Sequence, residues 1–396
     1  HLDMIESATG DYVDPLPFFM EKVKDNIAPR AEGIILFPQP GKGVVNGKQI
    51  HRTFPVNPTQ PITAWGLIGA GIRAYDHMDG VGNRYGVHTV ILEVDGEEVF
   101  RSVVDRFAYE ENRYINSWTH GQYMKSFIEP GNRLRMLHAS NGNRGLVEIN
   151  EERPYRFVYT LSDALGNTSK VRFTVQGKNT EIHPVEHREK YAFKWDRTNY
   201  LQEPGLELVV PRGMLYDDVW LDYSVRADSG DVAFTYQLHN KRVPLHGACE
   251  MRIGLRRDRL EDKSKYYVAG VTARGGKYSI GGTYEDGFMK VRIRDLGTYT
   301  VAVDTVPPEI IPLNPGQWGR TGRITLKAKD KETGINSYRG TIDGKYALFG
   351  KPNSISGNLV CELDPKHVKK GGRHTVEMTV TDGRGNRTTE EFHFVW

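Results

Sequence analysis

The chain has 396 residues, of which 38% are hydrophobic and 26% are charged, and its formal net charge is +3. This length predicts two to four domains, and the small net charge gives no support to nucleic-acid binding. No run of about 18 apolar residues is present, so we expect no transmembrane segment.

The composition favours strands and turns over helices, because the chain contains 42 Gly, 20 Pro and 20 Tyr. The two cysteines, Cys249 and Cys361, are far apart in the sequence, and we predict that both are free and buried. No signal peptide is visible. Because the chain begins with His1 rather than Met, we expect the native start to lie upstream.

Residues 1–24 read as the end of an earlier domain followed by an exit segment. The first five residues, HLDMI, alternate like a strand, and the prolines at positions 15 and 17 predict an extended stretch over residues 14–19. A strand without a neighbour cannot bury both faces. Its partner is therefore expected either upstream or on the next domain.

Alternating apolar and polar residues predict β-structure through the rest of the chain. We expect a β-sandwich over residues 25–178 with an insertion at about 100–150, a divergent β-sandwich over 179–303, and an immunoglobulin-like β-sandwich over 304–396. Residues 110–127, EENRYINSWTHGQYMKSF, interrupt the alternation and form either a short helix or a long loop. The predicted fold is all-β, with tandem sandwiches.

Four motifs recur in the same order, which indicates that one domain type is used twice. In the first copy they are DNIAP at 25–29, DHMDG at 76–80, the Asp-Gly turn at 95–96 and DALGN at 163–167. Their counterparts are DTVPP at 304–308, DKETG at 330–334, the Asp-Gly turn at 343–344 and DGRGN at 382–386. Asp-Gly between two alternating runs is a strong hairpin signal.

The acidic turns suggest calcium, because hard cations take several carboxylate and carbonyl oxygens. The candidate ligands are Asp76, Asp79 and Asp95 in the first copy and Asp330, Glu332 and Asp343 in the second. The alternative is that Asp and Gly occur there because hairpin turns need positive φ and side-chain caps. No twelve-residue loop with acids at alternate positions is present, so we favour the turn interpretation.

Other site motifs are missing from the sequence. The 13 histidines form no His-Glu-x-x-His pattern and no tight group, and there is no nucleophile elbow or phosphate loop. Trp118 and Trp318 fall in predicted loops and are the best candidates for an exposed aromatic platform.

The run HLD at residues 1–3, with DPLPF at 14–18, resembles the last strand and exit of lysostaphin/LytM-type zinc endopeptidases of peptidoglycan. Long members of this family from Bacteroidota carry β-sandwich domains after the peptidase. The runs DNIAP at 25–29, NRYGV at 83–87, RYIN at 113–116, VDTVPP at 303–308 and SYRG at 337–340 are similar to theirs.

The resemblance implies little catalytic machinery in this chain. His1 matches the first His of the family's final motif, but Asp3 stands where the second His, a zinc ligand, is expected. The other two ligands would lie in sequence that the chain does not contain, and one ligand cannot hold a catalytic zinc. We therefore expect no catalytic site and no cofactor in this chain, with zinc only if an upstream catalytic domain exists.

The resemblance implies a non-catalytic scaffold or binding region of an envelope protein, in the periplasm or at the outer membrane of a Gram-negative bacterium. The expected partners are peptidoglycan or an outer-membrane protein assembly. Two alternatives stay open, a fragment of an active zinc endopeptidase and a calcium-stiffened adhesin. The candidate contact residues are Arg113, Tyr114, Trp118, Tyr123 and Trp318, because aromatic insertions on sandwiches often carry recognition.

Overall fold

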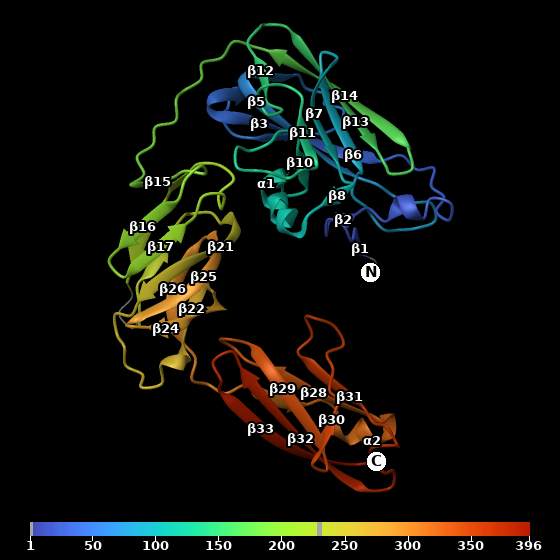
Figure 1. Ribbon diagram of the computed structural model, residues 1–396, viewed down its shortest axis with the longest axis vertical. Coiled ribbons are helices and arrows are strands. Elements are labelled where there is room, and N and C mark those ends of the chain that lie inside the picture. The colour runs from blue at the N-terminus through green and yellow to red at the C-terminus, as the bar shows by residue number, and fades with distance from the viewer. Residues whose placement is uncertain (1–2, 228–231) are drawn as a thin grey trace. The chain divides into compact units, whose positions relative to one another are not determined.

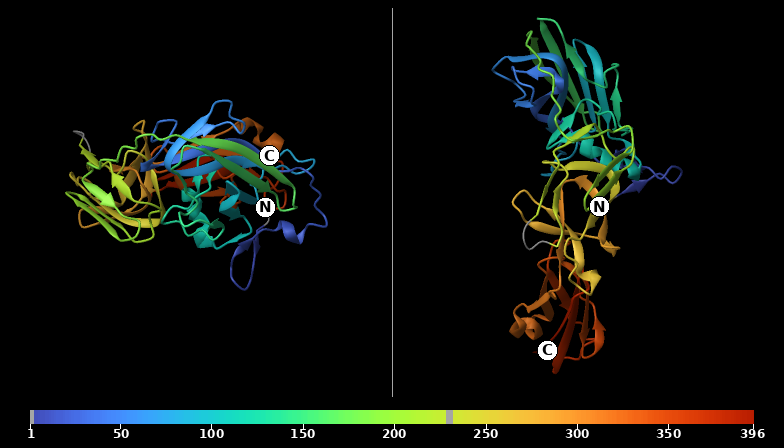
Figure 2. Two further views of the ribbon diagram at one scale, coloured as in Figure 1. Left: turned by 90° about the horizontal axis from the view of Figure 1, so that it is seen from above. Right: turned by 90° about the vertical axis from the view of Figure 1, so that its left-hand side faces the viewer.

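The computed structural model of the protein describes residues 3–227 and 232–396. Its regular structure is almost entirely β-strand (Figure 1 and Figure 2). The two α-helices among the described residues, α1 (Ile115–Trp118) and α2 (Trp318–Thr321), span four residues each. None of the described helices is long and apolar enough to cross a membrane. The predicted all-β class is confirmed.

Two compact units make up the chain. Unit 1 comprises His1–Arg188, Lys194–Arg197 and Arg212–Val219. Unit 2 comprises Glu189–Phe193, Thr198–Pro211 and Trp220–Trp396. The short strands β15 (Tyr191–Phe193) and β18 (Val219–Leu221) lie where the chain passes between the units.

Unit 1 contains an 11-stranded sheet in which β3 (Arg30–Val45) and β5 (Ile62–Tyr75) are the longest strands. The central order is β7-β6-β13-β14-β5, and only the β14–β5 pair is parallel among the pairs described. Apolar residues of β3 and β5 join those of β6, β7 and β13 in one buried core. The other strands are β4 (Arg52–Phe54), β6 (Thr89–Val94), β7 (Glu97–Val103), β9 (Thr119–His120), β10 (Tyr123–Lys125), β11 (Leu137–Ala139), β12 (Val147–Ile149), β13 (Pro154–Ser162) and β14 (Thr168–Gly177).

The N-terminal segment docks on the first sandwich, one of the two alternatives expected from the sequence. Strands β1 (Met4–Ile5), β2 (Tyr12–Val13) and β8 (Arg106–Phe107) form a small antiparallel sheet. The predicted extended exit is wrong at Leu16–Phe18, which form the 3-10 turn η1. Pro15 supplies a helical φ of −72°, and Asp14 Oδ1 accepts the Leu16 N–H at 2.9 Å, so the prolines start a turn here.

The interrupting segment, predicted as a short helix or a loop, is mainly helical. It consists of η2 (Tyr109–Tyr114), α1, and then the β9–β10 hairpin. Glu111 accepts the N–H of Ala108 at 2.8 Å and so caps the first turn of η2.

Unit 2 begins with two five-stranded sheets, in the orders β16-β17-β21-β25-β24 and β19-β20-β26-β22-β23. The first sheet comprises β16 (Asn199–Glu203), β17 (Leu206–Val210), β21 (Val243–Gly254), β24 (Thr283–Glu285) and β25 (Phe288–Leu296). The second comprises β19 (Ser224–Arg226), β20 (Thr235–Gln237), β22 (Tyr266–Val271), β23 (Lys277–Gly281) and β26 (Thr298–Val303), with the turn η3 (Lys263–Lys265) before β22.

The last sandwich, also in unit 2, packs a three-stranded sheet, β27-β28-β31, on a four-stranded one, β30-β29-β32-β33. Its elements are β27 (Glu309–Pro312), η4 (Pro315–Gln317), β28 (Arg323–Lys329), β29 (Ile335–Ile342), β30 (Lys345–Ala347), β31 (Asn358–Glu362), β32 (Arg373–Asp382) and β33 (Arg387–Val395). Cys249 and Cys361 are free and buried, as predicted.

The Asp-Gly turns close equivalent hairpins in the first and last sandwiches. Asp95 joins β6 to β7 with φ 54°, and Asp343 joins β29 to β30 with φ 49°. Each carboxylate also accepts a backbone N–H from the strand that lies beside the hairpin in the sheet, Asp95 from Arg156 of β13 at 2.8 Å and Asp343 from Thr375 of β32 at 2.9 Å. Turn chemistry therefore accounts for these two acids.

Candidate functional site

Three of the repeated motifs converge in space, and the first residue of each is an aspartate. Asp25, Asp76 and Asp163 form the first acidic cluster, in which one carboxylate oxygen from each residue lies within 4.8 Å of the others. Asp304, Asp330 and Asp382 form the second acidic cluster with the same spacing. The clusters belong to the first and last sandwiches respectively. Two similar domains therefore place three carboxylates at equivalent points.

The turn between the last two strands builds one side of each cluster in the same way. In the first sandwich, the Asn167 amide donates to the Asp25 carbonyl oxygen at 3.0 Å and to Asp163 Oδ2 at 2.7 Å. In the last sandwich, Asn386 makes the matching bonds to Asp304 and Asp382 at 3.0 and 2.7 Å. These repeated contacts explain why the Asp-x-x-Gly-Asn motif occurs twice.

Asp76 is the unusual member of the first cluster. It follows β5 directly, its backbone exchanges two hydrogen bonds of 2.9 Å with Tyr85, and only 6% of the residue is exposed. Its Oδ1 atom is buried and has no hydrogen-bond partner in the part of the chain that the structure describes. Burial, together with the nearby carboxylates of Asp163 and Asp25, raises the pKa of Asp76 to about 6, against a backbone hydrogen bond from His77 that lowers it. A buried carboxylate oxygen that lacks a donor is costly, and it marks this cluster as a candidate site.

The first cluster lines a cavity of about 510 Å³ in unit 1. The N-terminal segment contributes Met4, Tyr12 and Leu16 to its wall, and the sandwich contributes Met78 and Phe107 among others. The cavity therefore combines largely apolar walls with three convergent carboxylates. This combination is typical of small-ligand sites.

The second cluster is saturated with hydrogen-bond donors. Asp330 Oδ1 accepts the N–H groups of Glu332, Thr333 and Gly334 at 3.1, 2.7 and 2.6 Å. The Thr333 hydroxyl donates to Asp304 Oδ2 at 2.5 Å. Asp382 Oδ1 accepts the N–H of Asn386 at 2.9 Å. Protein donors thus satisfy the carboxylates here.

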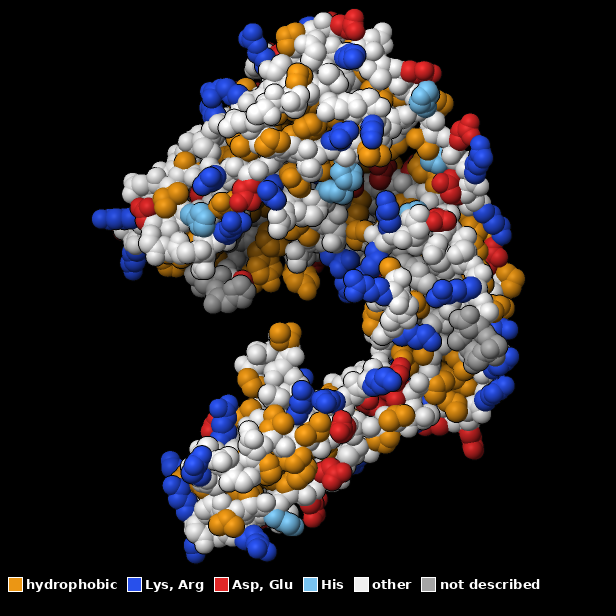
Figure 3. Space-filling model, turned by 180° about the vertical axis from the view of Figure 1, so that it is seen from behind, with side chains coloured by type: hydrophobic (Ala, Val, Ile, Leu, Met, Phe, Trp, Pro, Cys, Tyr) orange, Lys and Arg blue, Asp and Glu red, His pale blue; other side chains and the backbone are white. Residues whose placement is uncertain are grey.

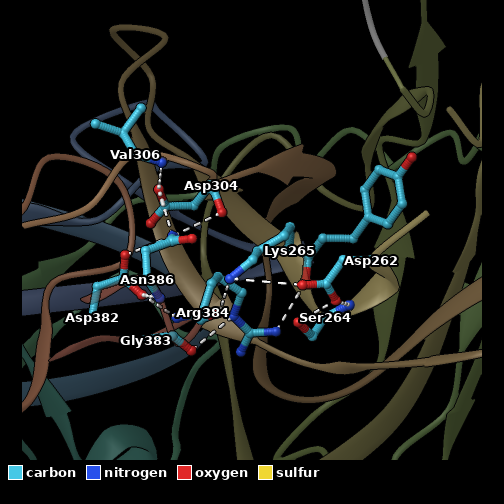
Figure 4. A network of polar contacts seen from close by, with 10 residues as sticks. Asp262, Ser264, Lys265, Asp304, Val306, Asp382, Gly383, Arg384 and Asn386 are labelled. Carbon is cyan, nitrogen blue, oxygen red and sulfur yellow. Dashed lines mark hydrogen bonds and ion pairs between the residues drawn. The ribbon is translucent and has the colours of Figure 1, made fainter. Parts of the chain in front are cut away.

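A positive side chain lies beside the second cluster in unit 2 (Figure 4). The Arg384 guanidinium donates to the carbonyl oxygens of Tyr266 and Gly282 at 2.9 and 3.0 Å, and the Lys265 ammonium donates to the Arg384 carbonyl at 3.0 Å. Burial lowers the pKa of Arg384, while the charges of Asp382 and Asp304 oppose that shift. We call Lys265, Tyr267, Glu332 and Arg384 the junction network, since Tyr267 also donates to Glu332 at 2.8 Å.

The six candidate calcium ligands do not lie together in the structure. Asp76 and Asp330 enter the two clusters, whereas Asp95 and Asp343 are turn residues. The Asp79 carboxylate accepts the Asn26 amide at 2.9 Å, and Glu332 accepts Tyr267. The favoured turn interpretation is therefore confirmed for Asp95 and Asp343, and the candidate ligands of each copy do not meet, because the other acids of each cluster come from distant motifs.

The predicted aromatic platform is wrong. Trp118 and Trp318 are 7% and 1% exposed, and their indole N–H groups donate to the carbonyls of Lys125 and Leu313. Both rings pack in sandwich cores, because Trp118 and Trp318 lie in the short helices α1 and α2 rather than in exposed loops. They are not available to stack on a ligand.

The other predicted contact residues are half-buried. Tyr114 packs against the first core, the Tyr216 hydroxyl donates to the Arg113 carbonyl at 2.6 Å, and the Arg73 guanidinium lies 5.7 Å from the centroid of the Tyr123 ring. Asp3 is exposed and lines the cavity, and His1 lies outside the described residues. Lys and Arg are interspersed with Asp and Glu over the face shown in Figure 3.

Comparison with known proteins gives one family match. Residues 190–304 match a model described as a Zu5-like domain, and no curated protein matches the chain. This match covers part of unit 2 and less than half of the chain, so it describes one domain.

Solved structures that align with the chain do so at low identity. The glycan-bound SGBP-B of the Bacteroides ovatus mixed-linkage glucan utilization locus has 10% identity and a TM-score of 0.15, with 89% of this chain and 70% of that one covered. A Ca²⁺-stabilized, ice-binding adhesin of an Antarctic bacterium has 10% identity and a TM-score of 0.16, with 94% and 90% covered. A tetra-tandem repeat from the extending region of a large adhesion protein has 11% identity and a TM-score of 0.19, with 94% and 92% covered. TM-scores this low identify neither a shared family nor a shared function.

Proposed function

We propose that the chain is a non-catalytic scaffold and binding region of a peptidoglycan-endopeptidase-like protein of the Gram-negative cell envelope. The resemblance of residues 1–3 and 14–18 to the peptidase exit supports this proposal, and with it a location in the periplasm or at the outer membrane is proposed. Peptidoglycan is the proposed partner, with an outer-membrane protein assembly as the competing one.

The observation that carries the scaffold role is the junction network. It joins the strands and turns of residues 179–303 to those of 304–396 through side chains with charge-assisted bonds. Glu332, which was a predicted metal ligand, serves this junction through its bond with Tyr267. Relative motion is the default between linked domains, and hydrogen bonds across the junction restrict it.

The cavity of unit 1 is the proposed contact site for the partner. Its apolar walls suit the aliphatic side chains of a stem peptide better than they suit a polysaccharide, whose hydroxyl groups would need many polar partners. Ala164 lines the cavity and is half-buried, so a larger side chain at this position would fill part of the space.

Co-sedimentation of the full chain with purified peptidoglycan sacculi tests the proposal. We expect the wild-type chain to pellet with sacculi, and Ala164→Trp to reduce the pelleted fraction several-fold. Tyr346→Ala, at an exposed position of the last sandwich, is the control and should bind like the wild type. If the two variants pellet with sacculi to the same extent, the cavity is not the contact site.

Two further experiments distinguish between the two proposed partners and between a non-catalytic and a catalytic role. A pull-down from envelope extract that recovers muropeptides without protein excludes the assembly as partner. If the pure chain released muropeptides from sacculi, or bound zinc stoichiometrically, the non-catalytic role would be wrong and the zinc-endopeptidase alternative would gain support.

A further inference from the structure

We propose that Asp25, Asp76 and Asp163 bind one hard divalent cation, with Ca²⁺ as the ion that the site suits best. The three residues come from the start of the first sandwich, the end of β5 and the β13–β14 turn. Their ligand oxygens lie within 4.8 Å of one another, and Asp76 and Asp163 are buried. This site does not depend on recognition of peptidoglycan.

The unpartnered oxygen of Asp76 is independent support for a ligand. Only 6% of Asp76 is exposed, so water has little access to its carboxylate. The Oδ1 atom also has no protein donor among the described residues. An ionised carboxylate in this setting is strongly unfavourable unless a positive charge compensates it. A cation between the three carboxylates supplies that charge.

The second acidic cluster shows what replaces a cation. Thr333 and Asp79 occupy the same position in the Asp-x-x-x-Gly motif, and the Thr333 hydroxyl donates to Asp304 where Asp79 has no side-chain proton to give. Arg384 and Leu165 likewise share a position, and only Arg384 brings a positive charge. The first cluster lacks both the hydroxyl donor and the guanidinium.

The chemistry of the ligands selects the ion. Carboxylate oxygens suit Ca²⁺ and Mg²⁺, whereas zinc favours the His and Cys ligands that this cluster lacks. Ca²⁺ tolerates irregular coordination and takes several oxygens, while Mg²⁺ demands near-octahedral geometry and keeps its waters. The adjoining cavity gives an entry path for the ion and room for water ligands.

Calorimetric titration of the chelator-treated full chain with CaCl₂, and separately with MgCl₂, tests the site. The expected result is about one Ca²⁺ per chain, with weaker Mg²⁺ binding. At a calcium concentration about 100 times Kd, the melting temperature of unit 1 should rise by roughly 5–10 °C.

Asp76→Asn is the decisive variant, because it keeps the shape of the side chain and removes the charge. It should lose both the stoichiometric binding and the calcium-dependent rise in melting temperature. Asp95→Asn, in the same domain but in a hairpin turn, and Asp330→Asn, at the equivalent point of the second cluster, should bind Ca²⁺ like the wild type. Binding that survives in Asp76→Asn, or no binding by the wild type at millimolar Ca²⁺, would overturn the proposal.

Discussion

The two acidic clusters differ in how the negative charge of their buried carboxylates is compensated. In the last sandwich, Asp330 Oδ1 accepts three backbone N–H groups and the Thr333 hydroxyl donates to Asp304, and the Arg384 guanidinium interacts electrostatically with Asp382 and Asp304. In the first sandwich the corresponding positions hold Asp79 and Leu165, and Asp76 keeps an oxygen without a donor. The same backbone arrangement thus has its carboxylates bonded by protein groups in the last sandwich, and forms the proposed cation site in the first.

Removal of the guanidinium should have the largest effect. We expect Arg384→Met to destabilise unit 2 by about 3 kcal/mol, because two charge-assisted hydrogen bonds are lost and the buried Asp304 and Asp382 lose a nearby positive charge. Urea unfolding measures the change. Arg387→Met, at an exposed position nearby, should change stability by less than about 0.5 kcal/mol. Equal losses in the two variants would remove the special role of Arg384.

Neutralising one carboxylate should have opposite effects in the two clusters. In metal-free solution at pH 7.5, Asp76→Asn should stabilise unit 1 by about 2 kcal/mol, because it removes an uncompensated buried charge. Asp330→Asn should destabilise unit 2 by about 1 kcal/mol, because three N–H groups then donate to a neutral oxygen. Thermal unfolding with chelator present gives both values. A shift of the same sign in both variants would contradict the comparison.

The stability of unit 1 should depend on pH through the same residue. Because burial raises the pKa of Asp76 from 3.8 to about 6, the folded chain binds this proton more tightly than the unfolded chain does. That contribution to stability is complete below pH 3.8 and is lost as the pH rises to about 6. The facing groups are Asp163, Asp25 and His77.

A series of melting temperatures from pH 4 to pH 7, recorded without metal, measures this loss. The decline attributable to Asp76 should be absent in Asp76→Asn, and Ca²⁺ should restore wild-type stability above pH 6. A decline that persists unchanged in the variant would assign it to another group.

An arginine introduced at the first cluster should compete with the cation. Leu165→Arg places the side chain of the second cluster at the equivalent position, and we expect it to weaken Ca²⁺ affinity by about tenfold, which is about 1.4 kcal/mol. Leu165→Met is the neutral control. If the arginine variant binds Ca²⁺ as tightly as the control, the guanidinium of Arg384 is not what replaces a cation.

The hairpin turns should respond least. His374 donates to the Asp343 carboxylate at 2.7 Å and holds the pKa of Asp343 below its ordinary value, but the Asp343 side chain is 48% exposed. Asp343→Asn should therefore cost less than about 1 kcal/mol, and Asn tolerates the positive φ of this turn. Chemical unfolding of this variant and of Asp95→Asn should give similar small losses. A loss above about 2 kcal/mol in either one would show that the turn carboxylate does more than cap the backbone.

Much of the architecture was predictable because its signals are local. The Asp-Gly turns and the alternation along β6, β13, β29 and β32 depend on residues a few positions apart. The prediction for the tryptophans failed, since burial of Trp118 and Trp318 depends on how the short helices α1 and α2 pack against the sandwich cores. This packing cannot be predicted from the residues next to each tryptophan in the sequence.

The sequence by itself determined the repeat, the all-β class and the three aspartates that open the repeated motifs. A signal for the cluster was present, because each of the motifs at 25–29, 76–80 and 163–167 begins with Asp. Only the tertiary structure decided that these three residues meet, that Asp95 and Asp343 stay apart from them, and that the Oδ1 atom of Asp76 is buried without a donor among the described residues. The physical reason is that turns form from neighbouring residues, whereas the compensation of a buried charge depends on every segment packed around it.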